Sequence, residues 1–288
     1  MNQLKLFIEL TRLKKPIGYM LLFWPCAWGL TLAYDFSSNL KYYFFYLVLF
    51  FLGSVLMRSA GCIVNDIFDK EFDAKVSRTK DRPIASGKIS IKFAIFYSII
   101  LCFFALLVLL NFNLFTVILA LGSMPLAFTY PLMKRLTYWP QLFLGITFNY
   151  GLILGWTAIK GQIDLAPIIF YLGAIFWTLG YDTIYGFQDI KDDEIIGLKS
   201  TSIKFKGKPK NFLFTCYIFL SILFIAGGFI MKFNYIYYFL SIIPIMHLLF
   251  YQMKIFNLDN PSSCLKVFKS NNLFGLIVFL KLLIVKIL

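Results

Sequence analysis

Two groups of carboxylates dominate the polar chemistry of this sequence, and together they hold ten of its 14 acidic residues. The first group comprises Asp66, Asp69, Glu71, Asp73 and Asp81. The second comprises Asp182, Asp189, Asp192, Asp193 and Glu194. Each follows a hydrophobic run and precedes a basic segment, KVSRTKDRPIASGK (75–88) or GLKSTSIKFKGKPK (197–210). The repeated order of acids and then bases predicts two halves of one site.

The spacing within each group would align several oxygens if the segment is helical. At ~100° per residue, one arc of about 100° holds Asn65, Asp66, Asp69 and Asp73, while Glu71 points away. A second, nearly straight line holds Asp182, Asp189 and Asp193, flanked by Tyr185 and Asp192. Each helix would therefore present a stripe of oxygen ligands with no His or Cys beside it.

Oxygen ligands at this spacing suit a hard cation, magnesium before calcium or manganese, and exclude a structural zinc site. Magnesium usually takes one or two carboxylates and completes its coordination with water and substrate phosphate oxygens. The sequence has no nucleotide-binding glycine motif. Two stripes with two basic segments therefore predict a non-nucleotide diphosphate held between metal ions, with Lys and Arg neutralising the remaining charge.

The simpler interpretation is that acids at helix ends only face the cytoplasm. It suffices for Glu71, Asp192 and Glu194, but not for Asp182, about two turns before the predicted helix end, or for Arg58 within VLMRSAGC. A charge at mid-bilayer costs roughly 2.5–3.5 kcal/mol on insertion scales, so such residues are functional by default. We therefore favour a functional role for Asn65, Asp69, Asp182 and Asp189.

The elements that must position these residues are membrane helices. Hydrophobic residues make up 60% of the chain and charged residues 15%, outside the range of soluble domains. The segments long enough to cross a bilayer as helices are 16–34, 41–64, 91–111, 113–132, 140–160, 164–188, 211–232, 234–254 and 270–288. The GxxxG at 151–155 predicts a close helix–helix contact.

The basic residues predict the orientation. With the N-terminus inside, the inside segments carry 22 Lys and Arg, whereas the outside loops carry only Lys41, Lys160 and Lys232. The first 15 residues lack the profile of a transit peptide, so we expect a multi-pass protein of a bacterial inner membrane with its site near the cytoplasmic face. Five scattered cysteines without a CxxC predict reduced, apolar residues. No soluble basic face is available for nucleic acid.

The motifs resemble those of the UbiA intramembrane prenyltransferases. NDIFDKEFD (65–73) is similar to the family's NDxxDxxxD signature, and YDTIYGFQDIKDD (181–193) to its YDxxYxxxDxxxD signature. Further similar segments are KPIGYMLLFWPCAWGL (15–30), LMRSAGCIVND (56–66), RTKDRPIASGKIS (78–90), YPLMKR (130–135), WPQLFLGITFNYGLILGW (139–156) and GLKSTSIKFKG (197–207). The resemblance extends to about residue 210 and is weaker in the last three helices.

The resemblance implies an all-α fold of nine transmembrane helices around a central cavity, with two Mg²⁺ ions holding a polyprenyl diphosphate. The implied metal ligands are Asn65, Asp69, Asp73, Asp182, Asp189 and Asp193, supported by Asp66 and Tyr185. The implied diphosphate ligands are Lys80, Arg82, Lys134, Arg135 and Lys199. Arg58 lies where the family faces its aromatic acceptor, and its guanidinium suits a benzoate carboxylate.

The same resemblance is strongest to the branch that acts on 4-hydroxybenzoate in ubiquinone biosynthesis, and it implies polyprenyl transfer to the 3-position of that ring. One departure is RLKKP, with Lys14 where the family commonly has Asp. We expect a single domain, 1–288, in which helices 1–4 and 5–8 form a possible pseudo-repeat and helix 9 is appended.

Two alternatives stay open. A UbiA-type enzyme with another acceptor, of the menaquinone, haem, chlorophyll or tocopherol type, would keep the metal site. An ion-coupled transporter could also use intramembrane acids. Against the transporter, the acids lie at the inside ends of their helices, and the adjacent basic segments suit an anionic substrate. Ion flux without substrate turnover would distinguish the transporter.

Overall fold

The computed structural model describes residues 3–76 and 78–288, and within them every regular element is a helix. The long helices are α2 (Ile17–Ala33), α3 (Leu40–Phe68), α5 (Ile91–Leu109), α6 (Leu114–Thr129), α8 (Pro140–Lys160), α9 (Leu165–Gly186), α12 (Pro209–Ile230), α13 (Tyr235–Met246) and α15 (Pro261–Ile287). The short elements are α1 (Gln3–Leu10), α4 (Lys70–Asp73), the 3₁₀ helix η1 (Tyr130–Leu132), α7 (Met133–Leu136), α10 (Ile190–Ile195), α11 (Thr201–Lys204), the π-helix η2 (His247–Gln252) and α14 (Met253–Ile255).

The all-helical membrane fold predicted from the sequence is confirmed. In the described part of the chain, eight helices are long and apolar enough to span a membrane, and α2 is a shorter apolar helix of 17 residues. These nine correspond to the nine predicted segments. The central cavity stays a prediction.

The last helix differs from its predicted bounds. It begins at Pro261, nine residues before the predicted start at 270. Proline is well suited to the first helical position, and the Asn260 side chain accepts hydrogen bonds from the N–H groups of Ser262 and Ser263. These capping interactions start a helix in a segment too polar to be recognised by hydropathy.

The core lies where α2, α9 and α15 meet. The rings of Trp28 in α2 and Trp177 in α9 lie 5.1 Å apart, and both side chains are fully buried. Each indole N–H is satisfied by α15: Trp28 donates to the Gly275 carbonyl (3.0 Å) and Trp177 to the Asn271 Oδ1 (2.8 Å). These bonds place polar anchors inside a largely apolar core, because a buried N–H without an acceptor is costly.

Helices α2 and α8 approach each other at glycines. A Cβ on Gly29 would lie 2.0 Å from the Leu152 carbonyl oxygen, and one on Gly155 would lie 2.3 Å from the Cys26 carbonyl oxygen. The close helix contact predicted from the GxxxG at 151–155 is therefore confirmed. At this contact the backbone of α2 packs directly against the backbone of α8.

We predict that Gly29→Ala destabilises the protein by at least ~2 kcal/mol, because the new methyl group meets backbone that cannot rotate away. The measurement is thermal or denaturant unfolding in detergent. Gly122→Ala in α6 is the matched control, since a Cβ there has nothing within 4 Å, and it should leave stability unchanged or raised. Equal effects of the two substitutions would contradict the close contact.

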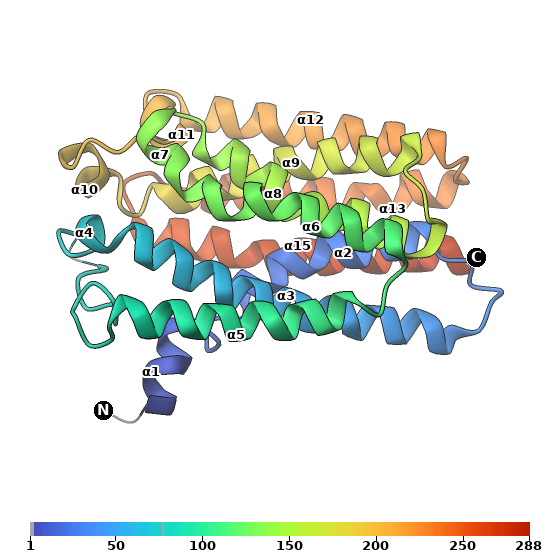
Figure 1. The fold of residues 1–288 in the computed structure, drawn as a ribbon. Helices are drawn as coiled ribbons and strands as arrows, with labels where there is room; N and C mark the ends of the chain where they lie inside the picture. Colours follow the sequence, from blue (N-terminus) through green and yellow to red (C-terminus); the bar gives the residue numbers. More distant parts are fainter. Residues whose placement is uncertain (1–2, 77) are drawn as a thin grey trace.

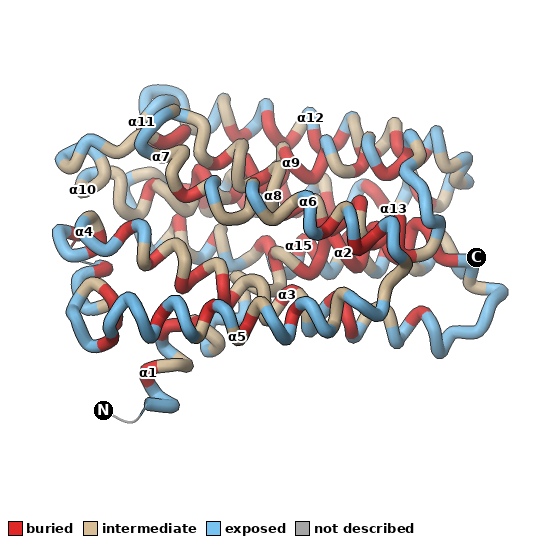
Figure 2. The backbone as a smooth tube through the Cα atoms, viewed as in Figure 1, coloured by how far each residue is buried: buried red, intermediate tan, exposed pale blue. Residues whose placement is uncertain are grey.

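The polar elements gather at one end of the bundle. Figure 1 shows α1, α4, α7, α10 and α11 at the same end, with the C-terminus at the other. The outward faces of α5 and α12 are mostly exposed in Figure 2, and in α5 they carry large apolar residues such as Phe93, Phe96, Ile99 and Phe103. In water such a surface would be unfavourable, so these faces contact lipid.

Candidate active site

Two aspartates lie at breaks between a membrane helix and a short helix. Helix α3 ends at Phe68 and α4 begins at Lys70, with Asp69 between them at φ −95° and ψ 2°. Helix α9 ends at Gly186, and Asp189 directly precedes α10. The second continuous helical stripe expected from the sequence is therefore wrong in detail, whereas Asn65, Asp69 and Asp73 keep the i→i+4 backbone bonds of the first. After Gly186 the backbone bonds tighten to the i→i+3 pattern and shift the register of Asp189 relative to Asp182.

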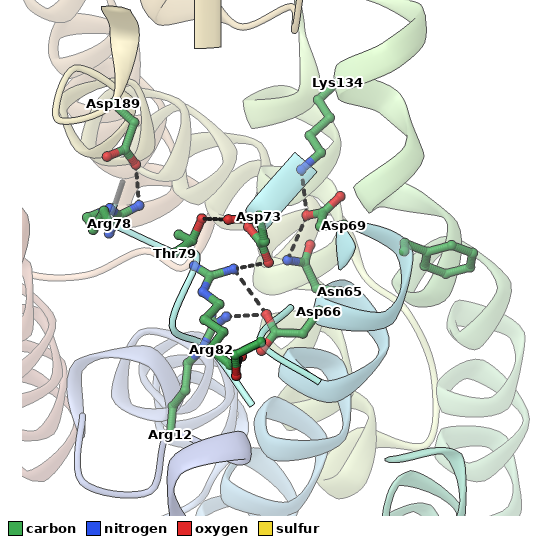
Figure 3. A network of polar contacts seen from close by, with 12 residues as sticks. Arg12, Asn65, Asp66, Asp69, Asp73, Arg78, Thr79, Arg82, Lys134 and Asp189 are labelled. Atoms are coloured by element: carbon green, nitrogen blue, oxygen red, sulfur yellow. Dashed lines mark hydrogen bonds and ion pairs between the residues drawn. The ribbon is translucent and has the colours of Figure 1, made fainter. Parts of the chain in front are cut away.

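The first acidic group is held by arginines. Asp66 is bound by Arg12 and, at 3.1 Å, by Arg82, and Arg82 also binds Asp73 at 2.6 Å (Figure 3). The Thr79 hydroxyl donates to the Asp73 carbonyl (2.9 Å), which fixes the segment carrying Arg82. Asp66 and Asp73 are thus oriented toward cations of this chain. The support role predicted for Asp66 and the metal role predicted for Asp73 stay predictions.

Asp69 is buried at this end of the bundle, as is Asp66. The Oδ2 of Asp69 accepts a hydrogen bond from Asn65 Nδ2 (3.0 Å) and forms an ion pair with Lys134 Nζ (2.5 Å). Its Oδ1 is buried and has no hydrogen-bond partner. Burial raises the pKa of the Asp69 carboxyl, and the nearby Lys134 ammonium opposes that rise. A buried oxygen without a partner beside an amide oxygen is a suitable ligand for a hard cation.

The second acidic group is reached by Arg78. Its Nη2 pairs with Asp189, and its Nη1 donates to the Tyr185 hydroxyl at 2.9 Å. The guanidinium carbon lies 5.4 Å from the centre of the Tyr185 ring. Burial and, to a smaller extent, the neighbouring Asp189 charge raise the pKa of Asp193 to about 6. Arg78 therefore joins the loop after the first acidic group to the second.

Lys134 acts on both groups. It pairs with Asp69, and its charge also lowers the pKa of Asp193 from the value that burial alone would give. Lys134 therefore lies close to residues of both acidic groups.

Arg58 lies deeper in the bundle than these acids. It is 11 residues before Asp69 on α3, about 16 Å along a helix axis. Its Nε is buried without a hydrogen-bond partner, and its guanidinium lies 5.6 Å from the Phe148 ring centre. The Asp182 carboxylate interacts electrostatically with Arg58. Asp182 thus lies within electrostatic range of Arg58, on α9 and earlier in the chain than Asp189.

Of the other predicted diphosphate ligands, Arg135 and Lys199 contact backbone carbonyls and Lys80 is exposed. Arg135 donates to the Phe68 carbonyl (2.6 Å), and its guanidinium lies 4.8 Å from the Phe72 ring centre. Lys199 donates from its backbone to the Lys134 carbonyl (2.8 Å) and from its ammonium to the Leu136 carbonyl (3.3 Å). Both residues therefore fix the segment that carries Lys134. Lys80 is exposed at the same end of the molecule.

The sequence reasoning missed Arg12 and Arg78 as site residues. Arg12 follows α1, which the sequence reasoning did not predict, and its backbone has φ of 55°, uncommon for a residue other than glycine. Burial would lower the pKa of the Arg12 guanidinium, but the charges of nearby groups, Asp66 among them, raise it above its ordinary value. Arg78 lies in a basic segment where spacing alone does not single it out. The available signal was the density of cations in that segment.

The donor set fits magnesium bound together with a substrate. Among the described residues, no three His, Cys, Asp or Glu side chains converge enough to hold an ion by themselves. The basic side chains of Arg78, Arg82 and Lys134 separate the acids. One or two carboxylates per ion, with diphosphate oxygens and water completing the shell, is the arrangement magnesium usually adopts.

The matching family model and the similar known proteins point to the same family. The model of the UbiA prenyltransferase family matches residues 22–278. The mitochondrial 4-hydroxybenzoate polyprenyltransferase of Drosophila melanogaster is 44% identical over 281 residues, which cover 96% of this chain and 70% of that protein. The human protein of the same name is 42% identical over 279 residues, covering 95% and 73%. The 4-hydroxybenzoate geranyltransferase 2 of Lithospermum erythrorhizon is 40% identical over 286 residues, covering 98% and 91%.

Solved structures show the same fold. A UbiA homologue from Aeropyrum pernix K1 has a TM-score of 0.78 at 23% identity, covering 94% of this chain and 99% of that chain. A homologue from Archaeoglobus fulgidus bound to GPP and Mg²⁺ has a TM-score of 0.74 at 18% identity, covering 98% and 100%.

Proposed function

The chain belongs to the UbiA prenyltransferase family, and from this we propose that it is a 4-hydroxybenzoate polyprenyltransferase of ubiquinone biosynthesis. It transfers a polyprenyl group from polyprenyl diphosphate to the 3-position of the ring. The observation that carries the proposal is the pair of carboxylates, Asp69 and Asp189, each just before a short helix and bound by Lys134 and Arg78 respectively. The identity to three relatives named for 4-hydroxybenzoate supports the acceptor.

We propose Mg²⁺ as the cofactor. The first ion would be held by Asn65 and Asp69, where Oδ1 of Asp69 is buried and has no partner, with Asp73 nearby. The second would be held by Asp189, with Asp193 or Asp182. When bound, magnesium would offset the negative charge of the diphosphate and make pyrophosphate a better leaving group. The Archaeoglobus fulgidus homologue bound to GPP and Mg²⁺ supports this assignment.

The chain's own basic residues would bind and orient the diphosphate. Arg82, Lys134 and Arg78 already lie among the acids, and Arg135, Lys199 and Lys80 surround them at the same end. Their charges would stabilise the negative charge that develops on the departing pyrophosphate. Tyr185 lies against Arg78, where its ring face would stabilise a developing allylic cation.

Arg58 would orient the aromatic acceptor. A guanidinium with an unpartnered, buried Nε matches a carboxylate, which it can bind with two parallel hydrogen bonds. The Phe148 ring beside it would contact the apolar face of the acceptor. The acceptor would then lie between Arg58 and the diphosphate, with its ring carbon directed toward the breaking bond.

The helices identify the chain as a multi-pass membrane protein, whereas the membrane in which it lies is a separate question. A bacterial inner membrane, with the site near the cytoplasmic face, is our proposal. The basic residues concentrated at the end that carries the acids support the orientation. The relatives from Drosophila melanogaster and Arabidopsis thaliana are named as mitochondrial, so membrane fractionation of source cells would decide the compartment.

One experiment tests the reaction and its alternatives together. Membranes containing the protein are incubated with radiolabelled 4-hydroxybenzoate, a polyprenyl diphosphate and Mg²⁺, and label in the lipid extract is counted. We expect transfer that EDTA abolishes. Transfer only to dihydroxynaphthoate or another acceptor would keep the family chemistry and reject this acceptor. No transfer to any acceptor, from folded protein that conducts ions, would favour the transporter.

Gly18 offers a finer test of the acceptor site. A Cβ at Gly18 would lie 2.7 Å from Arg58 Nε, so Gly18→Ala must displace the guanidinium while α2 and α3 can stay in place. We expect the KM for 4-hydroxybenzoate to rise about tenfold, the equivalent of ~1.4 kcal/mol, with the KM for the diphosphate unchanged. Gly53→Ala, whose Cβ makes only an ordinary 3.9 Å contact with Val108, is the control. An unchanged acceptor KM would place the acceptor elsewhere.

A further inference from the structure

The two central carboxylates are each occupied by a cation of this chain. Asp69 Oδ2 binds the Lys134 ammonium, and Asp189 Oδ2 binds the Arg78 guanidinium (Figure 3). The cations come from outside the helices that carry the acids: Lys134 from α7, and Arg78 from the segment between α4 and α5. Asp69 directly follows the membrane helix α3, and Asp189 lies three residues after the end of α9.

The ion pairs of Asp69 and Asp189 differ in number from those of Asp66 and Asp73. Asp66 is bound by two arginines at once, and Arg82 bridges Asp66 and Asp73, so removing one contact leaves another. Lys134 and Arg78 each have one carboxylate partner in an ion pair. The Asp69 side chain is 3% exposed and that of Asp189 15% exposed, while Lys134 is 24% and Arg78 40% exposed. Each cation is therefore more exposed to solvent than the carboxylate that it binds.

A divalent ion that binds Asp69 or Asp189 competes with these cations. Ion and ammonium would approach the same carboxylate, where their like charges repel strongly in a partly buried site. A diphosphate removes this conflict, because its oxygens can accept the displaced ammonium and guanidinium and also coordinate the metal.

On the basis of the proposed function, we propose that Lys134 and Arg78 are exchangeable counter-ions. They hold Asp69 and Asp189 until metal and diphosphate arrive together, and they then transfer to the diphosphate oxygens. The site consequently binds a free divalent ion weakly and a metal–diphosphate complex tightly. Each ligand raises the affinity for the other by the same factor, because linkage between binding equilibria is reciprocal.

The test measures metal binding without turnover. Purified protein in lipid nanodiscs is titrated with Mn²⁺, with bound ion followed by electron paramagnetic resonance, alone and with an unreactive thiolo analogue of an allylic diphosphate. For the unmodified chain we expect the analogue to lower the Kd of Mn²⁺ by about tenfold or more.

Two variants should change the affinity for free Mn²⁺ and the effect of the analogue in opposite directions. Arg78→Gln and Lys134→Gln should each bind Mn²⁺ alone several-fold more tightly, because the competing cation is gone. Each should also lose most of the effect of the analogue. A simple structural or diphosphate-binding role would weaken analogue binding without tightening free Mn²⁺. Lys206→Gln is the matched control, since it breaks a 2.5 Å pair with Glu194 at the exposed rim, and it should change neither quantity.

Two results would overturn the inference: an analogue that leaves the Mn²⁺ affinity of the unmodified chain unchanged, or variants that bind free Mn²⁺ equally or more weakly. Failure of the proposed acceptor is separable, because the coupling between Mn²⁺ and the analogue is measured without 4-hydroxybenzoate. A chain that shows the coupling but prenylates another acceptor would retain the counter-ion exchange and reject only the acceptor.

Discussion

Replacing Asp69 or Asp189 with asparagine should reduce kcat/KM by about 10³-fold or more while leaving the fold intact. Asparagine keeps the shape of the side chain and removes the anionic ligand that a divalent ion requires. Stabilisation of the departing pyrophosphate by a bound metal ion would amount to several kcal/mol, and each ~1.4 kcal/mol is a factor of ten in rate. The measurement is label transfer from polyprenyl diphosphate at saturating Mg²⁺, with thermal unfolding of each variant measured in parallel.

Glu71→Gln provides the matched control for Asp69→Asn. Glu71 lies two residues away, in α4, and is exposed. The substitution removes the same charge from the same segment, so a general electrostatic effect on diphosphate attraction would appear in both variants. We expect Glu71→Gln to stay within about twofold of the unmodified enzyme, as surface charges contribute little. Near-normal turnover by Asp69→Asn would remove this residue from the metal site.

The membrane fold could be predicted from the sequence because hydrophobic length is a strong signal for spanning helices. The nine predicted segments all correspond to helices, and the predicted bounds of 140–160 match those of α8. The start of α15 was missed because its first residues are polar and its position depends on a proline and an asparagine cap. Capping acts through hydrogen bonds that hydropathy does not measure.

The residues of the candidate site could be predicted by type, but their partners could not. Scarcity made Asp69, Asp189 and Arg58 conspicuous in an apolar chain. Which cation reaches which acid depends on how loops fold back, and a basic segment with several Lys and Arg offers many equivalent choices. Arg78 reaches Asp189 across 111 residues of sequence, a contact that local spacing cannot indicate.

Asp182 shows how a helical stripe can mislead. On an unbroken helix it would align with Asp189 and Asp193. The chain leaves the α-helix after Gly186 and resumes it at Ile190, so the alignment is lost and Asp182 instead interacts with Arg58. The role of Asp182 as a metal ligand stays a prediction, and loss of Mn²⁺ affinity in Asp182→Asn is the result expected from it.

The second large effect is expected at Arg58. Arg58→Met removes the guanidinium and keeps an apolar side chain of similar length beside Phe148. The carboxylate of 4-hydroxybenzoate would then be buried without a partner, a loss that typically costs 2–5 kcal/mol. We expect the acceptor KM to rise about 30-fold or more at an unchanged diphosphate KM, measured by label transfer. Arg58→Lys should recover only part of the loss, because an ammonium cannot form the two parallel bonds of a guanidinium.

An acceptor without the carboxylate isolates the role of the guanidinium. The unmodified enzyme should prenylate the methyl ester of 4-hydroxybenzoate poorly, and Arg58→Met should use it about as well as the unmodified enzyme does, because the interaction that was removed is absent from both reactions. Thermal unfolding of Arg58→Met is measured in parallel, because the substitution also removes the positive charge that acts on the Asp182 carboxylate. A variant that loses diphosphate affinity but keeps the acceptor KM would instead place Arg58 at the diphosphate, and the position of the acceptor in the bundle would have to be reassigned.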